Sequence, residues 1–104
     1  MSTISTENDL VTFINVWSVE PANQQQLVDL SVEIIEAVQK TEVGFVSASI
    51  HKSLDGNQVI IYAQWRSQED LHRSLKNPEL TSRAEKMTQI GKPLPKLYQV
   101  VYAT

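Results

Sequence analysis

A tight turn near the middle of the chain constrains its fold more than any other feature. Asp55 and Gly56 form a dipeptide that is typical of a two-stranded β-hairpin. They separate two runs rich in β-forming residues, at 45–52 and 58–65, and each run has the length and composition of a single strand. The sequence therefore predicts an antiparallel hairpin at the centre of the fold, with the rest of the chain arranged around it.

Helical patterns flank this hairpin on both sides. Apolar residues recur at helical spacing over 22–40, and two short helices are predicted after the hairpin, at 68–76 and 79–90. A strand is predicted at each end of the chain, at 10–19 and 97–103. The order β-α-β-β-α-β predicts a ferredoxin-like, split-βαβ arrangement, which is an α+β fold with a four-stranded antiparallel sheet.

Length and composition describe one folded domain. The chain has 104 residues, of which 41% are hydrophobic and 20% are charged, as in a globular protein rather than a disordered one. Residues 1–9 are polar and are predicted to form a frayed tail, while 10–104 form the domain. The tail lacks the basic and apolar regions of a signal peptide, and no apolar run is long enough to span a bilayer. We therefore expect a cytoplasmic protein that does not act at a membrane.

Charge, cysteine and glycine content argue against several classes of function. The net charge is -3, which disfavours nucleic acid as a partner because phosphate binding needs a basic surface. The chain has no cysteine, which excludes disulfides and thiolate catalysis. Neither of its two histidines has a second ligand at metal-binding spacing, and three glycines cannot build a phosphate-binding loop. We therefore expect no metal and no bound cofactor.

The predicted strands are apolar on both faces. Along 58–65, the alternating apolar side chains are Val59, Ile61, Ala63 and Trp65 on one face and Ile60 and Tyr62 on the other. The helices of this fold cover one face of the sheet, and the second face is normally polar. A second copy of the same sheet is the simplest cover for a second apolar face, and two-fold dimers are the commonest oligomers. We therefore expect a homodimer.

The candidates for a binding or catalytic site are polar and aromatic side chains of the predicted strands and the last helix: Asn15, Trp17, His51, Tyr62, Trp65, Arg83, Tyr98 and Tyr102. Asn15 stands among apolar neighbours in mid-strand, where a buried amide needs hydrogen-bond partners. A neighbouring backbone group and a substrate are equally good partners on sequence grounds. The default roles of the others are structural: core or interface aromatics, an exposed strand-end histidine and a solvated arginine.

Three segments together resemble the antibiotic biosynthesis monooxygenase family. They are the strand Gly44-Phe45-Val46-Ser47-Ala48, the turn Asp55-Gly56, and Tyr62-Ala63-Gln64-Trp65-Arg66-Ser67 before the next helix. Their order and spacing carry the resemblance, which extends over nearly the whole domain. It implies a dimeric α+β barrel, in agreement with a sheet that is apolar on both faces.

Within that family, the chain resembles most the small oxygenases of aromatic polyketide pathways. The resemblance implies that no cofactor is used, that molecular oxygen oxidises an anthrone-like phenol to a quinone, and that the substrate supplies the electrons. It maps their site tryptophan onto Trp65 and an arginine onto Arg83. An asparagine and a tyrosine of that site are replaced here by Ile61 and Leu71. Asn15 would then supply the missing amide from the first strand.

The haem-degrading monooxygenases, a related branch, also carry an asparagine on the first strand. Their haem-ligating histidine and a tryptophan map onto Ala84 and Ser74 of this chain. Because the axial ligand is replaced by alanine, haem degradation is not expected.

Two functions from different classes remain open. The first is a cofactor-independent monooxygenase that oxidises a small phenol, quinol or anthrone-like compound. Its catalytic residues would be Trp65, Arg83, Asn15 and His51, and its substrate-binding residues Trp17, Tyr62, Ile61 and Leu71. The second is a non-catalytic domain on the same scaffold that binds a small hydrophobic ligand or acts in a stress response. An isomerase or lyase ranks below both because the sequence offers no clear acid–base pair.

Overall fold

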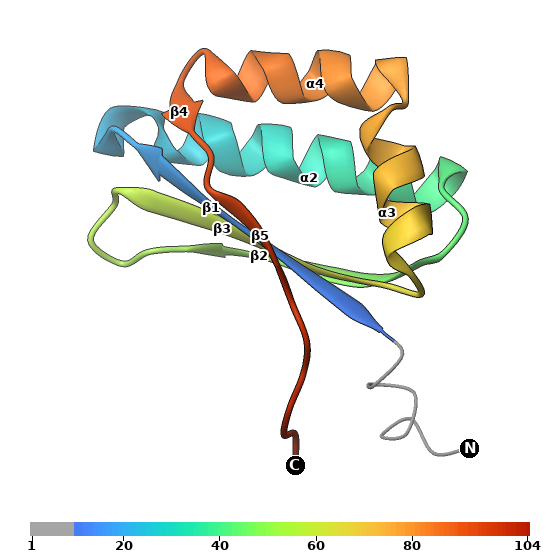
Figure 1. Cartoon of the computed structure of the whole chain (residues 1–104). Helices are drawn as coiled ribbons and strands as arrows, with labels where there is room; N and C mark the ends of the chain where they lie inside the picture. The colour runs from blue at the N-terminus through green and yellow to red at the C-terminus, as the bar shows by residue number, and fades with distance from the viewer. Residues whose placement is uncertain (1–9) are drawn as a thin grey trace.

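The computed structural model describes residues 10–104, and the predicted tail at 1–9 lies outside the described residues. Its elements, in chain order, are β1 (Val11–Val19), η1 (Pro21–Asn23), α2 (Gln24–Thr41), β2 (Phe45–Lys52), β3 (Gln58–Trp65), α3 (Gln68–Leu75), α4 (Pro78–Thr88), β4 (Gly91–Lys92) and β5 (Pro95–Tyr98). The predicted ferredoxin-like α+β fold is confirmed, with three α-helices packed against an antiparallel sheet (Figure 1).

The sheet has the strand order β2-β3-β1-β4, and β5 also pairs with β1. It contains five strands rather than four because the end of the chain pairs with β1 in two separate pieces. The predicted strand at 97–103 therefore starts earlier and ends earlier than expected, at Tyr98. Tyr98 pairs with Thr12, next to the first residue of β1. Beyond that point only Val11 of β1 remains, and 99–104 form no strand.

All three α-helices lie on one face of the sheet (Figure 1). The residues of β3 that face them are the odd-numbered set, Val59, Ile61, Ala63 and Trp65, and each is buried. With Trp17 and residues of the helices they form two core clusters, one around Leu27 and Met87 and one around Leu71 and Leu80. The period-two alternation of the strands thus directs one side-chain set into the space between sheet and helices.

Within the described residues, no helix covers the second face of the sheet (Figure 1). Ile14, Val16, Ile60 and Tyr62 lie on that face and are half-buried, and Tyr98 is 45% exposed. A solvent-facing sheet surface of an isolated domain is normally polar.

Two glycines with positive φ fix the turns around the hairpin. Gly56 has φ +89 in the predicted turn, and Gly44 has φ +90 before β2, a region that favours glycine.

The Ser53 hydroxyl and the Asn57 backbone N–H hold the pKa of the Asp55 carboxyl below its ordinary value. Ser67 is the N-cap of α3, and its side chain accepts a hydrogen bond from Asp70 N. In residues 10–104, no helix combines the length and apolarity that crossing a bilayer requires.

Candidate active site

A cavity of about 150 Å³ lies between the sheet and the three α-helices. Its lining residues come from five elements: Phe13, Asn15 and Trp17 of β1; Ile61, Ala63 and Trp65 of β3; Ile34, Ile35 and Val38 of α2; Leu71, Ser74 and Leu75 of α3; and Leu80, Thr81, Ala84 and Met87 of α4. Eight residues were predicted as catalytic or substrate-binding in an oxygenase. Five of them line this cavity, namely Asn15, Trp17, Ile61, Trp65 and Leu71.

The cavity wall carries no ionisable side chain, because none of its residues is an acid, a base or a tyrosine. The hydroxyl of Ser74 donates to the backbone oxygen of Leu71, and that of Thr81 donates to the backbone oxygen of Pro78. Both hydroxyls are therefore bonded within their own helices. The polar groups left to meet a ligand are the amide of Asn15 and the indole N–H groups.

Asn15 is anchored by the backbone of the segment that follows β4. Its Oδ1 accepts a hydrogen bond from Leu94 N at 3.0 Å, and its side chain lines the cavity. This bond assigns the amide orientation, because an N–H donor must meet the oxygen rather than the NH2 group. The NH2 group has no acceptor among the described residues. Of the two roles that the sequence left open, the oxygen therefore fills the backbone role, and the NH2 group is available for the ligand role.

Trp65 ends β3 and is 3% exposed. The ring of Phe45 packs edge-on against it, with centroids 5.6 Å apart and an interplanar angle of 76°, a favourable arrangement for an aromatic pair. Phe45 also pairs with Trp65 across β2 and β3. The indole is thus fixed on one side by strand pairing and aromatic packing, and it presents another part of its surface to the cavity.

Ile61 faces Asn15 directly, because the two residues are partners in the β1–β3 register. Cross-strand partners have Cβ atoms about 4.5–5.5 Å apart. Position 61 is where the resemblance placed an asparagine in the polyketide oxygenases. The amide of this chain therefore stands on the same region of the sheet, one strand away.

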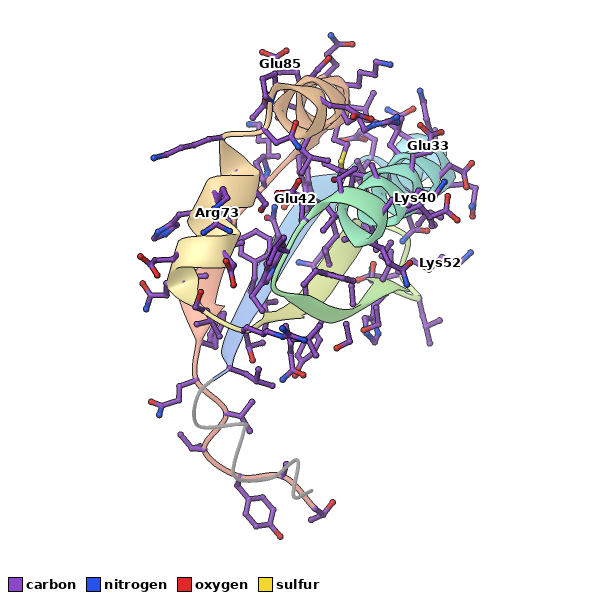
Figure 2. The ribbon with its side chains drawn as sticks, turned by 90° about the vertical axis from the view of Figure 1, so that its right-hand side faces the viewer. Glu33, Lys40, Glu42, Lys52, Arg73 and Glu85 are labelled. Carbon is purple, nitrogen blue, oxygen red and sulfur yellow. The ribbon has the colours of Figure 1, made fainter. Side chains whose placement is uncertain are left out.

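Three predicted site residues lie outside this cavity. Arg83 is on the outer side of the α2–α4 pair, where its guanidinium lies 3.2 Å from Glu79 and 3.6 Å from Glu33. Figure 2 shows Glu33 and Lys40 on the side of α2 that is turned away from the sheet. Arg83 is held there because Glu79 precedes it by one helical turn, a favourable spacing for an ion pair.

His51 and Tyr62 lie on the second face of the sheet. Tyr62 is an even-numbered residue of β3, so its side chain points away from the helices. His51 is exposed, and its Nε2 lies 2.9 Å from Ser49 Oγ. The structure therefore does not bring these residues together with Trp65 and Asn15.

Sequence reasoning missed most of the helical wall of the cavity. Leu71 was predicted as substrate-binding, and the comparison with haem-degrading enzymes singled out the positions of Ser74 and Ala84; all three line the cavity. Apart from Thr81, the helical residues that were missed are ordinary apolar residues of amphipathic helices, which no motif distinguishes from core. Residues 10–104 contain no cluster of three or more His, Cys, Asp or Glu side chains with the geometry of a metal site.

Comparison with known proteins gives this cavity a context. The family model for antibiotic biosynthesis monooxygenase matches residues 10–86. The chain is 38% identical over 103 residues to tetracenomycin-F1 monooxygenase from Streptomyces glaucescens, in an alignment that covers 99% of this chain and 92% of that protein.

Solved structures give the same fold. A monooxygenase from the gene ActVA-Orf6 of Streptomyces coelicolor, in complex with nanaomycin D, superposes with a TM-score of 0.81 at 24% identity, covering 100% of this chain and 97% of that chain. SnoaB, a cofactor-independent oxygenase from Streptomyces nogalater, superposes with a TM-score of 0.75 at 20% identity, covering 91% and 96%. The family model over residues 10–86 and the 38% identical relative show that this chain is an oxidoreductase that belongs to the antibiotic biosynthesis monooxygenase family.

Proposed function

We propose that this chain is a cofactor-independent monooxygenase that oxidises a small anthrone-like phenol with molecular oxygen. The observation that carries the proposal is an apolar cavity that both Trp65 and Asn15 line. The relative named tetracenomycin-F1 monooxygenase and the description of SnoaB as cofactor-independent support the reaction class.

The size of the cavity limits how much of a substrate it encloses. An apolar cavity of about 150 Å³ is large enough for one benzene-sized ring. A polycyclic substrate would therefore insert one ring and leave the others toward the mouth, unless the helices move apart. Leu75 at the end of α3 lines the cavity and is 52% exposed, so it marks the side from which such a substrate would enter.

In this proposal the residues of the chain orient the substrate and stabilise its anion. The Trp65 indole packs on the inserted ring, and the Asn15 NH2 group donates a hydrogen bond to its phenolic or carbonyl oxygen. A hydrogen bond to a charged oxygen contributes about 1.5–3 kcal/mol, and an apolar surrounding strengthens it. The cavity wall has no ionisable side chain, so the substrate loses its proton to solvent at the mouth of the cavity rather than to a base in this wall.

The reaction balances without a further reductant. Conversion of a ring CH2 group into a carbonyl supplies the four electrons that reduce O2. One oxygen atom forms the new carbonyl, and the other leaves as water with the two hydrogens. The proposed role of the protein is to hold the electron-rich anion in an apolar space that admits O2 and excludes water.

We also propose that the chain is a homodimer that pairs through the second face of its sheet. Ile14, Val16, Ile60 and Tyr62 on that face are apolar or aromatic and half-buried, and a two-fold copy of the same surface would cover them. Such pairing would bury His51 and Tyr62 between subunits, away from the cavity.

The oxygenase proposal is tested with an oxygen electrode. Chelator-treated protein is mixed with 1,8-dihydroxyanthrone and, separately, with a panel of quinols, and O2 uptake is compared with a protein-free blank. We expect uptake that falls at least tenfold in Trp65→Phe and remains in Arg73→Ala, whose side chain is 62% exposed on the outside of α3 (Figure 2). With ¹⁸O2, the quinone should gain one labelled oxygen.

One observation favours a second candidate, a domain that binds a small hydrophobic ligand without catalysis. The lack of any ionisable group in the cavity wall suits retention of an apolar molecule as well as an oxygenase. If aromatic ligands raise the melting temperature while no compound of the panel causes O2 uptake above the blank, the oxygenase proposal fails and this candidate replaces it.

A further inference from the structure

Trp17 carries a buried hydrogen-bond donor without an acceptor. Its side chain is 3% exposed and lines the cavity, and its Nε1 has no hydrogen-bond partner among the described residues. Leaving a buried donor unsatisfied is unfavourable, and such groups in folded proteins are rare. A ligand bound in the cavity that Trp17 lines is one group that could supply the missing acceptor.

The packing of the Trp17 indole shows which edge of the ring faces β4. A Cβ atom placed on Gly91 would lie 3.3 Å from Trp17 Cε3, so the Cε3 edge of the ring faces β4. Nε1 is on the opposite edge of an indole, so it is turned away from β4. Gly91 itself does not line the cavity, whereas Ile61 and Met87, which belong to the same cluster as Trp17, do.

Trp17 and Asn15 lie two residues apart on β1, and both side chains face the helices. Residues at this spacing are about 7 Å apart along a strand. The Trp17 N–H and the Asn15 NH2 group are therefore two neighbouring neutral donors on one strand, while the Ser74 and Thr81 hydroxyls of the wall are bonded within their own helices.

We propose that Trp17 Nε1–H donates a hydrogen bond to an oxygen of the bound substrate, so that β1 recognises the oxygenated edge of an aromatic ring. Trp17 would then be a specificity-determining residue, and the ligand class would be aromatic compounds with a carbonyl or phenolate oxygen rather than plain hydrocarbons. The inference rests on the proposed function in that both use the same cavity, although binding is tested separately from turnover.

Two neutral donors suit an anionic or carbonyl oxygen because they stabilise it without giving up a proton. A cationic partner would hold the anion in an ion pair, and an acidic partner would reprotonate it. Donors from amide and indole groups keep the charge on the substrate, where it is available for reaction with O2.

The test uses a pair of ligands with the same carbon skeleton. 1-Tetralone has one ketone oxygen next to its aromatic ring, tetralin has none, and the ketone contains no readily oxidised phenol. Dissociation constants for both are measured with wild-type protein, with Trp17→Phe, and with Leu27→Met. Leu27 is fully buried beside Trp17 but does not line the cavity, so its variant controls for altered packing.

We expect the affinity ratio of 1-tetralone to tetralin to fall about fivefold to tenfold in Trp17→Phe, the loss expected for one neutral hydrogen bond. The ratio should stay within twofold of wild type in Leu27→Met. An unchanged ratio in Trp17→Phe, or no binding of 1-tetralone to the wild type, overturns the inference.

A spectroscopic measurement on the wild type removes any dependence on how the variant folds. The chain contains two tryptophans, so a ¹H–¹⁵N spectrum has two indole signals, which Trp65→Phe assigns. The Trp17 Hε1 signal should move downfield with 1-tetralone and not with tetralin, and a signal that responds equally to both contradicts the proposal. If the ratio and the signal behave as expected while no O2 uptake occurs, the oxygenase proposal fails and the binding site stands.

Discussion

Replacement of Asn15 by leucine separates the structural role of its amide from the proposed role in binding the substrate. The variant keeps the branched shape of the side chain but removes two interactions. One is the 3.0 Å hydrogen bond from Leu94 N to Oδ1. The other is the hydrogen bond that the NH2 group would donate to the substrate anion.

The two losses have different expected sizes. Leu94 is 58% exposed, so water can reach its amide, and we expect a loss of about 1 kcal/mol, at the low end for an unsatisfied donor. For a domain of this length that loss lowers the melting temperature by roughly 4–8 °C. The lost bond to the substrate anion is worth about 1.5–3 kcal/mol, which lowers kcat/KM roughly 10- to 150-fold.

The assay is O2 uptake with 1,8-dihydroxyanthrone at a temperature well below the melting transition, with the melting temperature measured in parallel. Ser31→Ala is the matched control: Ser31 is fully buried, donates to Leu27 O at 2.8 Å and does not line the cavity. It should lose about 1 kcal/mol of stability and keep its kcat/KM. If Asn15→Leu melts lower but retains kcat/KM within twofold, Asn15 is purely structural and the assignment is refuted.

Three further predictions follow from the same geometry. Arg83→Gln should change kcat/KM by less than twofold because the guanidinium is paired outside the cavity, and a tenfold loss in steady-state assays would mean that Arg83 reaches the substrate. Gly44→Ala should lower the melting temperature by roughly 10 °C, since φ +90 disfavours alanine and its Cβ would collide with the Asp70 carboxylate; an unchanged melting curve would contradict this. Ile60→Glu should give monomers in light scattering, because it places a charge in the proposed sheet-to-sheet interface, and a dimeric mass would exclude that interface.

The fold was largely predictable because its signals are local. Helices and strands differ in the period of their apolar residues, and the turn at Asp55 and Gly56 fixes the register of the central hairpin. The last strand was less predictable because a strand extends only as far as its partner. Val100 and Val101 have β-forming side chains, but β1 starts at Val11, so the sheet offers them no neighbour.

The site was predictable only where the strand alternation decides which face a side chain occupies. Asn15, Trp17, Ile61 and Trp65 share one parity within their strands and one cavity in the structure. Tyr62 has the opposite parity, so the alternation already excluded it from that cavity. For Arg83 the contrary signal was Glu79, four residues earlier, which predicts an ion pair on the helix surface.

The chain differs from the polyketide oxygenases that it resembles at Ile61, where they carry an asparagine. The cross-strand pairing of Asn15 with Ile61 bears directly on this difference. The isoleucine removes an amide from β3, and by itself this makes the cavity more apolar. However, cross-strand partners on one face are close enough that either can reach the same ligand atom. Asn15 also lines the cavity and is anchored by Leu94 through its oxygen, so its amide is held in one orientation rather than free to rotate. An oxygenase site of this kind needs a fixed hydrogen-bond donor near position 61 of the sheet. The β1–β3 register places the Asn15 amide of β1 there. Leu71 has no comparable replacement: its neighbours in the wall are apolar or bonded within their helices. We therefore expect the polar contacts of the substrate to concentrate on β1, with α3 contributing shape alone.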